Sequence, residues 1–219
     1  MLSKNIIGLS MAGVLMAGTA MAQTTATAVT DLNLRAGPGP NYVILDVIAE
    51  KDDATVDGCL ADANWCKVTY NGTSGWAYGD YLSVTQSGEV VALYPNRETV
   101  EVSTVTYEND QQADAALTLG AMGAAAGALI VGGPLAIAAG AAAGMIGGAA
   151  IEPDTTVVTY VTENPVEPVF VNGEVVVGAG IPETVTLYPV PDADYQYVNL
   201  NGQYVFVRPE DRRIVYIQR

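Results

Sequence analysis

The chain has 219 residues, enough for one or two domains of ordinary size, and 24 acidic against nine basic residues give it a formal net charge of −15. Such an acidic chain is a poor partner for nucleic acid, because phosphates are bound by clustered Lys and Arg. It contains no histidine and only two cysteines, which excludes most general-base schemes and four-thiolate zinc sites. We therefore expect a protein that is not an enzyme, with no catalytic residues, cofactor or metal site.

Residues 1–22 have the pattern of a secretory signal peptide. Lys4 precedes an apolar run at residues 6–17, and Ala20-Met21-Ala22 is a small-x-small cleavage pattern. The run is short for a membrane-spanning helix, and no cysteine follows the cleavage pattern to carry a lipid anchor. We expect export to the periplasm or cell envelope, with the mature chain beginning at Gln23.

Residues 23–85 alternate short apolar runs with Gly, Pro, Asn and Asp, which is typical of an all-β domain. Asn33-Leu34-Arg35-Ala36-Gly37-Pro38 leads into a Gly/Pro turn, Asn71-Gly72 is a hairpin signal, and Gly75-Trp76 is followed shortly by Tyr81-Leu82. In this order the motifs closely resemble the bacterial SH3-like family (SH3b), over residues 27–84. The resemblance implies a small, strongly bent β-barrel that binds peptidoglycan or a cell-wall peptide.

The ligand-binding candidates in this barrel are aromatic residues and one arginine. Aromatic rings suit peptides and sugars because they offer a flat apolar face and, in Tyr and Trp, a polar tip. Arg35 either pairs with a ligand carboxylate or braces the turn that follows it. Core packing is the alternative for most of the rings, above all for Trp76, whereas Tyr42 is the better candidate for an exposed groove. The full set is Arg35, Tyr42, Trp65, Trp76, Tyr78 and Tyr81.

The two cysteines, Cys59 and Cys66, flank a turn-like stretch at residues 61–64. Export would place them in an oxidising compartment, and their spacing fits a disulfide across a hairpin. Such a bridge would stabilise the fold by roughly 2–3 kcal/mol. Two unpaired core thiols are the alternative.

Residues 86–114 form an acidic, β-prone connector, and residues 115–151 then contain no charged residue and are rich in Ala and Gly. Gly132-Gly133-Pro134 divides this second segment into two arms, each about 17 residues long. Glycines four residues apart lie on one helical face and let two helices approach closely, which predicts a glycine-zipper helical hairpin. The packing glycines are Gly123, Gly127, Gly140, Gly144 and Gly148.

Three fates remain open for residues 115–151. Each arm is shorter than the roughly 30 Å hydrocarbon core of a bilayer, yet an uncharged Ala/Gly helix pair has no polar face to keep it in water. A membrane-inserted hairpin, a hairpin buried in self-association and a weakly ordered linker are the alternatives.

Residues 152–219 return to a β pattern, with hairpin signals at Asn172-Gly173 and Asn201-Gly202 and a closing strand at residues 212–217. Motifs across residues 155–219 resemble the DUF1236 family, which has no established activity; the resemblance implies a bacterial envelope setting. The motifs are Glu167-Pro168-Val169, Gly178-Ala179-Gly180-Ile181-Pro182, Leu187-Tyr188-Pro189-Val190-Pro191 and Arg212-Arg213-Ile214-Val215.

The expected architecture is therefore mainly β: an SH3-like barrel, an Ala/Gly helical hairpin and a small C-terminal module of β-hairpins. The leading hypothesis is an exported, non-enzymatic envelope protein that binds peptidoglycan or a peptide. The alternative is a structural or membrane-associated assembly protein driven by the hairpin, and a third idea is an accessory subunit that localises a separate hydrolase.

Overall fold

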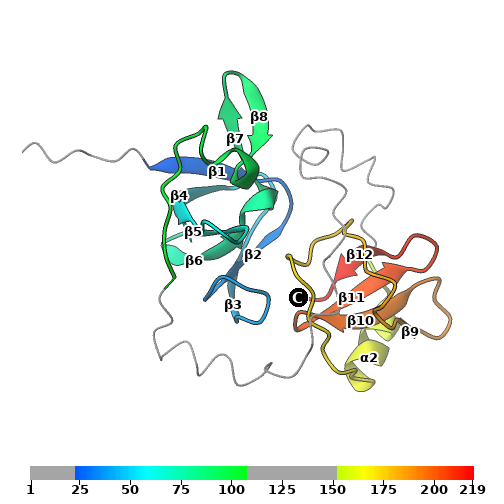
Figure 1. The fold of residues 1–219 in the computed structure, drawn as a ribbon. Helices are drawn as coiled ribbons and strands as arrows, with labels where there is room; N and C mark the ends of the chain where they lie inside the picture. Colours follow the sequence, from blue (N-terminus) through cyan, green and yellow to red (C-terminus); the bar gives the residue numbers. More distant parts are fainter. Residues whose placement is uncertain (1–22, 108–151) are drawn as a thin grey trace, which may run out of the picture.

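The computed structural model describes residues 23–107 and 152–219 (Figure 1). In these residues the protein is mainly β, as predicted, with one eight-stranded and one four-stranded antiparallel sheet and one α-helix. The predicted signal peptide at residues 1–22 and the predicted glycine-zipper hairpin at residues 115–151 lie outside the described residues. Within the described residues, no helix is long and apolar enough to cross a membrane.

The N-terminal domain, residues 23–107, carries the larger sheet. Its strand order is β3-β2-β6-β5-β4-β1-β7-β8. Register shifts between β2 and β3 and between β4 and β5 bend the sheet. The elements are β1 (Thr24–Ala28), β2 (Leu32–Arg35), β3 (Ile44–Ile48), β4 (Asp53–Cys59), β5 (Trp65–Tyr70), β6 (Thr73–Tyr78), the 3-10 helix η1 (Gly79–Tyr81), β7 (Leu82–Gln86), β8 (Glu89–Ala92) and the 3-10 helix η2 (Tyr94–Asn96).

Local sequence explains a tight turn and a close strand contact in this sheet. The β5–β6 hairpin turns at Asn71 and Gly72, whose φ angles of 47° and 82° are the left-handed values that an Asn-Gly turn supplies. Gly75 lets β6 lie directly against β2, because a Cβ at this position would stand 2.7 Å from the carbonyl oxygen of Arg35 and 2.8 Å from Cγ of Leu34. Leu34 itself is fully buried in the core. Gly75 is therefore a packing requirement of the barrel.

The C-terminal module, residues 152–219, holds the smaller sheet in the order β12-β11-β10-β9, and Asn201-Gly202 makes the predicted turn between two of its strands. The predicted closing strand is present as well. The elements are α2 (Thr155–Glu163), β9 (Tyr188–Pro189), β10 (Gln196–Leu200), β11 (Gln203–Arg208) and β12 (Arg213–Ile217).

Two expectations for this module were wrong. The β pattern predicted for residues 152–219 does not extend to residues 155–163, which form helix α2. The helix buries Val161 against the sheet, and tertiary packing overrides weak propensity. Asn172-Gly173 does not turn a hairpin. Its segment is held instead by Asn201, whose side chain accepts a hydrogen bond from the Val171 amide and donates one to the Gly173 carbonyl.

The smaller sheet buries both of its faces. Tyr197, Phe206 and Val215 pack on the side of α2. The residues that alternate with them, including Val198, Val205 and Ile214, belong to an apolar core that continues into the N-terminal domain. Alternation along each strand thus places this sheet between α2 and the N-terminal domain.

Candidate functional site

Strands β2, β6 and β5 bring most of the predicted ligand-binding residues onto one face of the larger sheet. Strand pairing sets Arg35 opposite Trp76, and Trp65 opposite Tyr78. Side chains that face each other across neighbouring strands project to the same side, and so do residues two apart in one strand. We define the outer face as Asn33, Arg35, Trp65, Trp76 and Tyr78. Neither tryptophan belongs to the main apolar core, although Tyr78 packs against that core.

The C-terminal module supplies a carboxylate to this outer face. Arg35 Nη2 donates a hydrogen bond of 2.6 Å to Glu174 Oε1, and Arg35 Nε donates to Glu174 Oε2. Asn33 Nδ2 and the Val175 amide donate further hydrogen bonds to Glu174 Oε1, at 3.0 and 2.8 Å. Both charged side chains are buried. Four donors thus converge on one carboxylate, in the two-pronged geometry by which guanidinium recognises carboxyl groups.

Arg35 also braces the turn that follows its strand. Its Nη1 donates to the carbonyl oxygens of Pro40 and Tyr42, at 3.0 and 2.8 Å. The two roles that the sequence left open for this arginine, carboxylate partner and turn brace, are therefore combined, and the carboxylate comes from the same chain. Because these loop carbonyls belong to the SH3-like domain, they hold the guanidinium in place independently of Glu174.

A connector residue covers the aromatic part of the outer face. The ring of Tyr107 lies edge-on to Trp76, with centroids 5.5 Å apart, and edge-on to Tyr42 at 5.9 Å. Trp76 is only 5% exposed. Tyr42 lies in the loop before β3, where its ring occupies the space that a side chain at Gly37 would need. Sequence reasoning missed Tyr107, which stands in the acidic connector without a motif around it.

The remaining predicted aromatics form a cluster in which Trp65 and Tyr81 are buried and Tyr78 is half-buried. Trp65 packs edge-on to Tyr78 at 5.4 Å, and Tyr78 lies 5.9 Å from Tyr81. Burial, with smaller contributions from the charges of Asp80 and Glu174 among others, raises the pKa of Tyr78 to about 12. Burial likewise raises the pKa of Tyr81, which is fully buried in η1. Both phenols therefore stay neutral at physiological pH, and Tyr81 is a core residue here.

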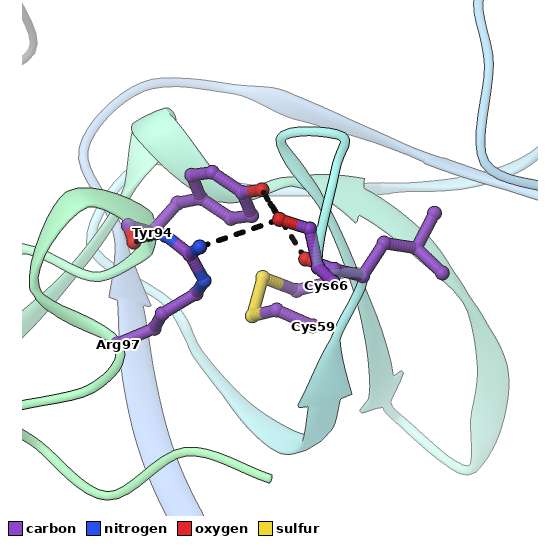
Figure 2. The surroundings of a disulfide bond; sticks show 6 residues. Cys59, Cys66, Tyr94 and Arg97 are labelled. Atoms are coloured by element: carbon purple, nitrogen blue, oxygen red, sulfur yellow. Dashed lines mark hydrogen bonds between the residues drawn. A yellow bond between two sulfur atoms is a disulfide. The ribbon is translucent and has the colours of Figure 1, made fainter. Parts of the chain in front are cut away.

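The course of the connector is fixed at the disulfide end of the β4–β5 hairpin (Figure 2). Cys59 and Cys66 are joined, which confirms the predicted bridge. Next to the bridge, the Tyr94 hydroxyl shares its one proton between the carbonyl oxygens of Leu60 and Ala61, at 3.2 and 3.1 Å. The Arg97 guanidinium, stacked 4.3 Å from the Tyr94 ring, also donates to the Ala61 carbonyl. These contacts tie the segment after β8 to the hairpin.

The same hairpin then guides the connector onward to the outer face. The Cys59 amide donates to the carbonyl oxygen of Ser103, and the Val105 amide donates to that of Cys59, at 2.9 and 3.0 Å. Gly58 allows this approach, since a Cβ there would stand 2.7 Å from the Ser103 carbonyl oxygen. Tyr107 follows two residues after this pairing, so the disulfide-bonded hairpin positions the ring that covers Trp76.

In residues 23–107 and 152–219, no cluster of three acidic or cysteine side chains could hold a metal ion.

Comparison with known families identifies one domain in each of the two described parts of the chain. Residues 30–83 match the family model of the bacterial SH3 domain. Residues 160–219 match that of the domain of unknown function DUF1236. A search of curated proteins found no match. The chain therefore contains a bacterial SH3 domain and a DUF1236 domain, as the two resemblances predicted, and its disulfide is compatible with an extracytoplasmic protein.

Proposed function

We propose that this is an exported, non-enzymatic protein of the bacterial cell envelope whose SH3 domain binds peptidoglycan or a peptide through its outer face. The arrangement of Arg35 carries the proposal. Its guanidinium is held by loop carbonyls and donates hydrogen bonds to a carboxylate, on the face that also carries Trp65, Trp76 and Tyr78. Peptides and wall polymers offer carboxylates and apolar surfaces to such a face. The disulfide supports an oxidising, extracytoplasmic location.

The second candidate is structural, and a specific observation favours it. One apolar core runs through both domains, and a buried charge pair joins them. On this alternative the outer face serves only to dock the DUF1236 domain, and the SH3 domain is a spacer in an assembly protein. Association with a membrane or with further copies through residues 115–151 belongs to the same alternative.

Sedimentation of the mature chain with purified, insoluble peptidoglycan separates the two. Binding through the SH3 domain predicts saturable sedimentation that is weakened by Tyr42→Ala, since Tyr42 borders the outer face. Loss of a contact ring typically costs about 1–3 kcal/mol of binding free energy. Tyr188→Ala removes a ring that is 39% exposed on the edge strand of the other domain and is the matched control. If Tyr42→Ala and Tyr188→Ala sediment alike, the ligand is not bound at this face.

A further inference from the structure

We infer that Glu174 is a built-in stand-in for the ligand, so that the SH3 outer face selects a peptide carboxylate of the cell wall and the DUF1236 domain competes with that ligand for Arg35. This inference rests on the proposed function and deepens it. It names the chemical group that the face recognises and the residue that blocks it.

The first support is the form in which Glu174 reaches the face. The segment around it, residues 170–177, contributes to neither sheet as a strand, yet it buries Val171, Val175 and Val176. Its hold on the SH3 domain combines apolar side chains with one carboxylate. Glu174 therefore reaches the face on a non-strand segment, through side-chain contacts rather than through strand pairing.

The second support is that the SH3 domain itself holds the guanidinium in place. Arg35 donates to the carbonyl oxygens of Pro40 and Tyr42, which do not depend on Glu174, whereas Asn33 also bonds Gln203 Oε1 of the DUF1236 domain at 2.9 Å. If Glu174 moved away, a buried guanidinium would be left without a counter-charge, which is strongly unfavourable. A ligand that brings its own carboxylate supplies this counter-charge again, whereas a neutral ligand leaves Arg35 unpaired.

The third support is that a second part of the face is filled in the same manner. Tyr107, from the connector, places its ring against Trp76 and Tyr42. The chain thus supplies both chemical elements that the face is built to receive, a carboxylate for the guanidinium and a ring for the aromatic residues. A ligand at Arg35 meets its competitor in Glu174, and a ligand that extends to Trp76 meets a second in Tyr107.

The test measures binding of the mature chain to two forms of insoluble peptidoglycan, one native and one whose free carboxyl groups have been converted to amides with a carbodiimide and ammonia. We expect affinity for the amidated wall to be at least tenfold lower. Equal affinity for both forms would overturn the carboxylate inference while leaving the proposed function intact. Absence of binding to either form by every variant would remove the proposed function itself.

Variants of Glu174 test the competition. Glu174→Gln keeps the shape of the side chain but gives up the charge, so affinity for native wall should rise about tenfold, because the competing contact is weakened. Glu174→Asp keeps the charge on a shorter side chain and should give a smaller rise; it also serves if the Gln variant does not fold. Glu183→Gln, at an exposed position of the same domain, is the control and should leave affinity unchanged. Folded Glu174 variants that bind native wall no better than the wild type would show that Glu174 does not compete.

Discussion

Arg35 and Glu174 lie 139 residues apart in the chain and form a charge pair whose side chains are 1% and 0% exposed. The pair connects the SH3 domain to the DUF1236 domain, and the two domains also share one continuous apolar core. Removing one member of such a pair leaves the other charge buried and uncompensated, whereas removing both does not. The two residues should therefore be energetically coupled.

A double-mutant cycle measures this coupling. Arg35→Met alone should lower the free energy of unfolding by about 3–5 kcal/mol, because Glu174 stays buried without its partner. Arg35→Met combined with Glu174→Leu should cost clearly less than the sum of the two single changes. Urea unfolding of the four proteins gives the coupling energy. Additive effects would mean that the pair contributes nothing beyond its separate contacts.

The covering role of Tyr107 can be measured through tryptophan fluorescence. The chain has two tryptophans, so Trp65→Phe leaves Trp76 as the single reporter. Tyr107→Ala in that background should increase quenching of Trp76 by acrylamide, since the ring now packed edge-on against it is removed. Tyr188→Ala in the same background is the control. Unchanged quenching would show that other groups keep Trp76 buried.

The parts of the fold that the sequence predicted are those determined by short stretches of chain. The Asn71-Gly72 and Asn201-Gly202 hairpins form because each turn has its own backbone preference, whatever lies elsewhere. Asn172-Gly173 shows the limit of that reasoning. The same dipeptide makes no hairpin there, because its flanking segment is bound by Asn201 and by the contact of Glu174 with Arg35.

The sequence nominated most residues of the candidate site, but it did not predict that other parts of the chain cover them. Alternation and the SH3 resemblance nominated Arg35, Trp65, Trp76 and Tyr78, and strand register places all four on one face. Glu174 and Tyr107 cover this face through contacts between segments that are distant in the sequence. Tyr107 has no motif around it, and Glu174 follows an Asn-Gly signal that predicted a hairpin, so local patterns did not indicate that either residue covers the face.

The disulfide should contribute measurably to stability. Replacing Cys59 and Cys66 together by serine should lower the free energy of unfolding by about 2–3 kcal/mol, because a short loop is no longer closed in the unfolded chain. Urea unfolding of the wild type under reducing conditions should give a similar loss and is the control. Thiol labelling of the denatured, unreduced protein should detect no free cysteine, and labelling at both positions would contradict the bridge.

Asp80 provides a pH-dependent test of packing around the buried tyrosines. Burial raises the pKa of its carboxyl above the ordinary value of 3.8, and the hydrogen bond donated by Asn64 opposes this rise. A pKa that is higher in the folded state means that the fold favours the protonated form. The stabilising contribution is thus present below the ordinary pKa and is lost as the pH rises through the folded pKa. At neutral pH the ionised Asp80 therefore weakens the fold.

Asp80→Asn should consequently raise the urea midpoint at pH 7, because it removes the buried charge while its side-chain oxygen still accepts the hydrogen bond from Asn64. The difference from the wild type should shrink as the pH falls and disappear below the ordinary carboxyl pKa of 3.8, where Asp80 is protonated in both the folded and the unfolded chain. Asp62→Asn, at an exposed position, removes the same charge from a chain whose formal net charge is −15 and controls for general repulsion. Should both variants give the same difference from the wild type at every pH, the effect belongs to net charge and not to the burial of Asp80.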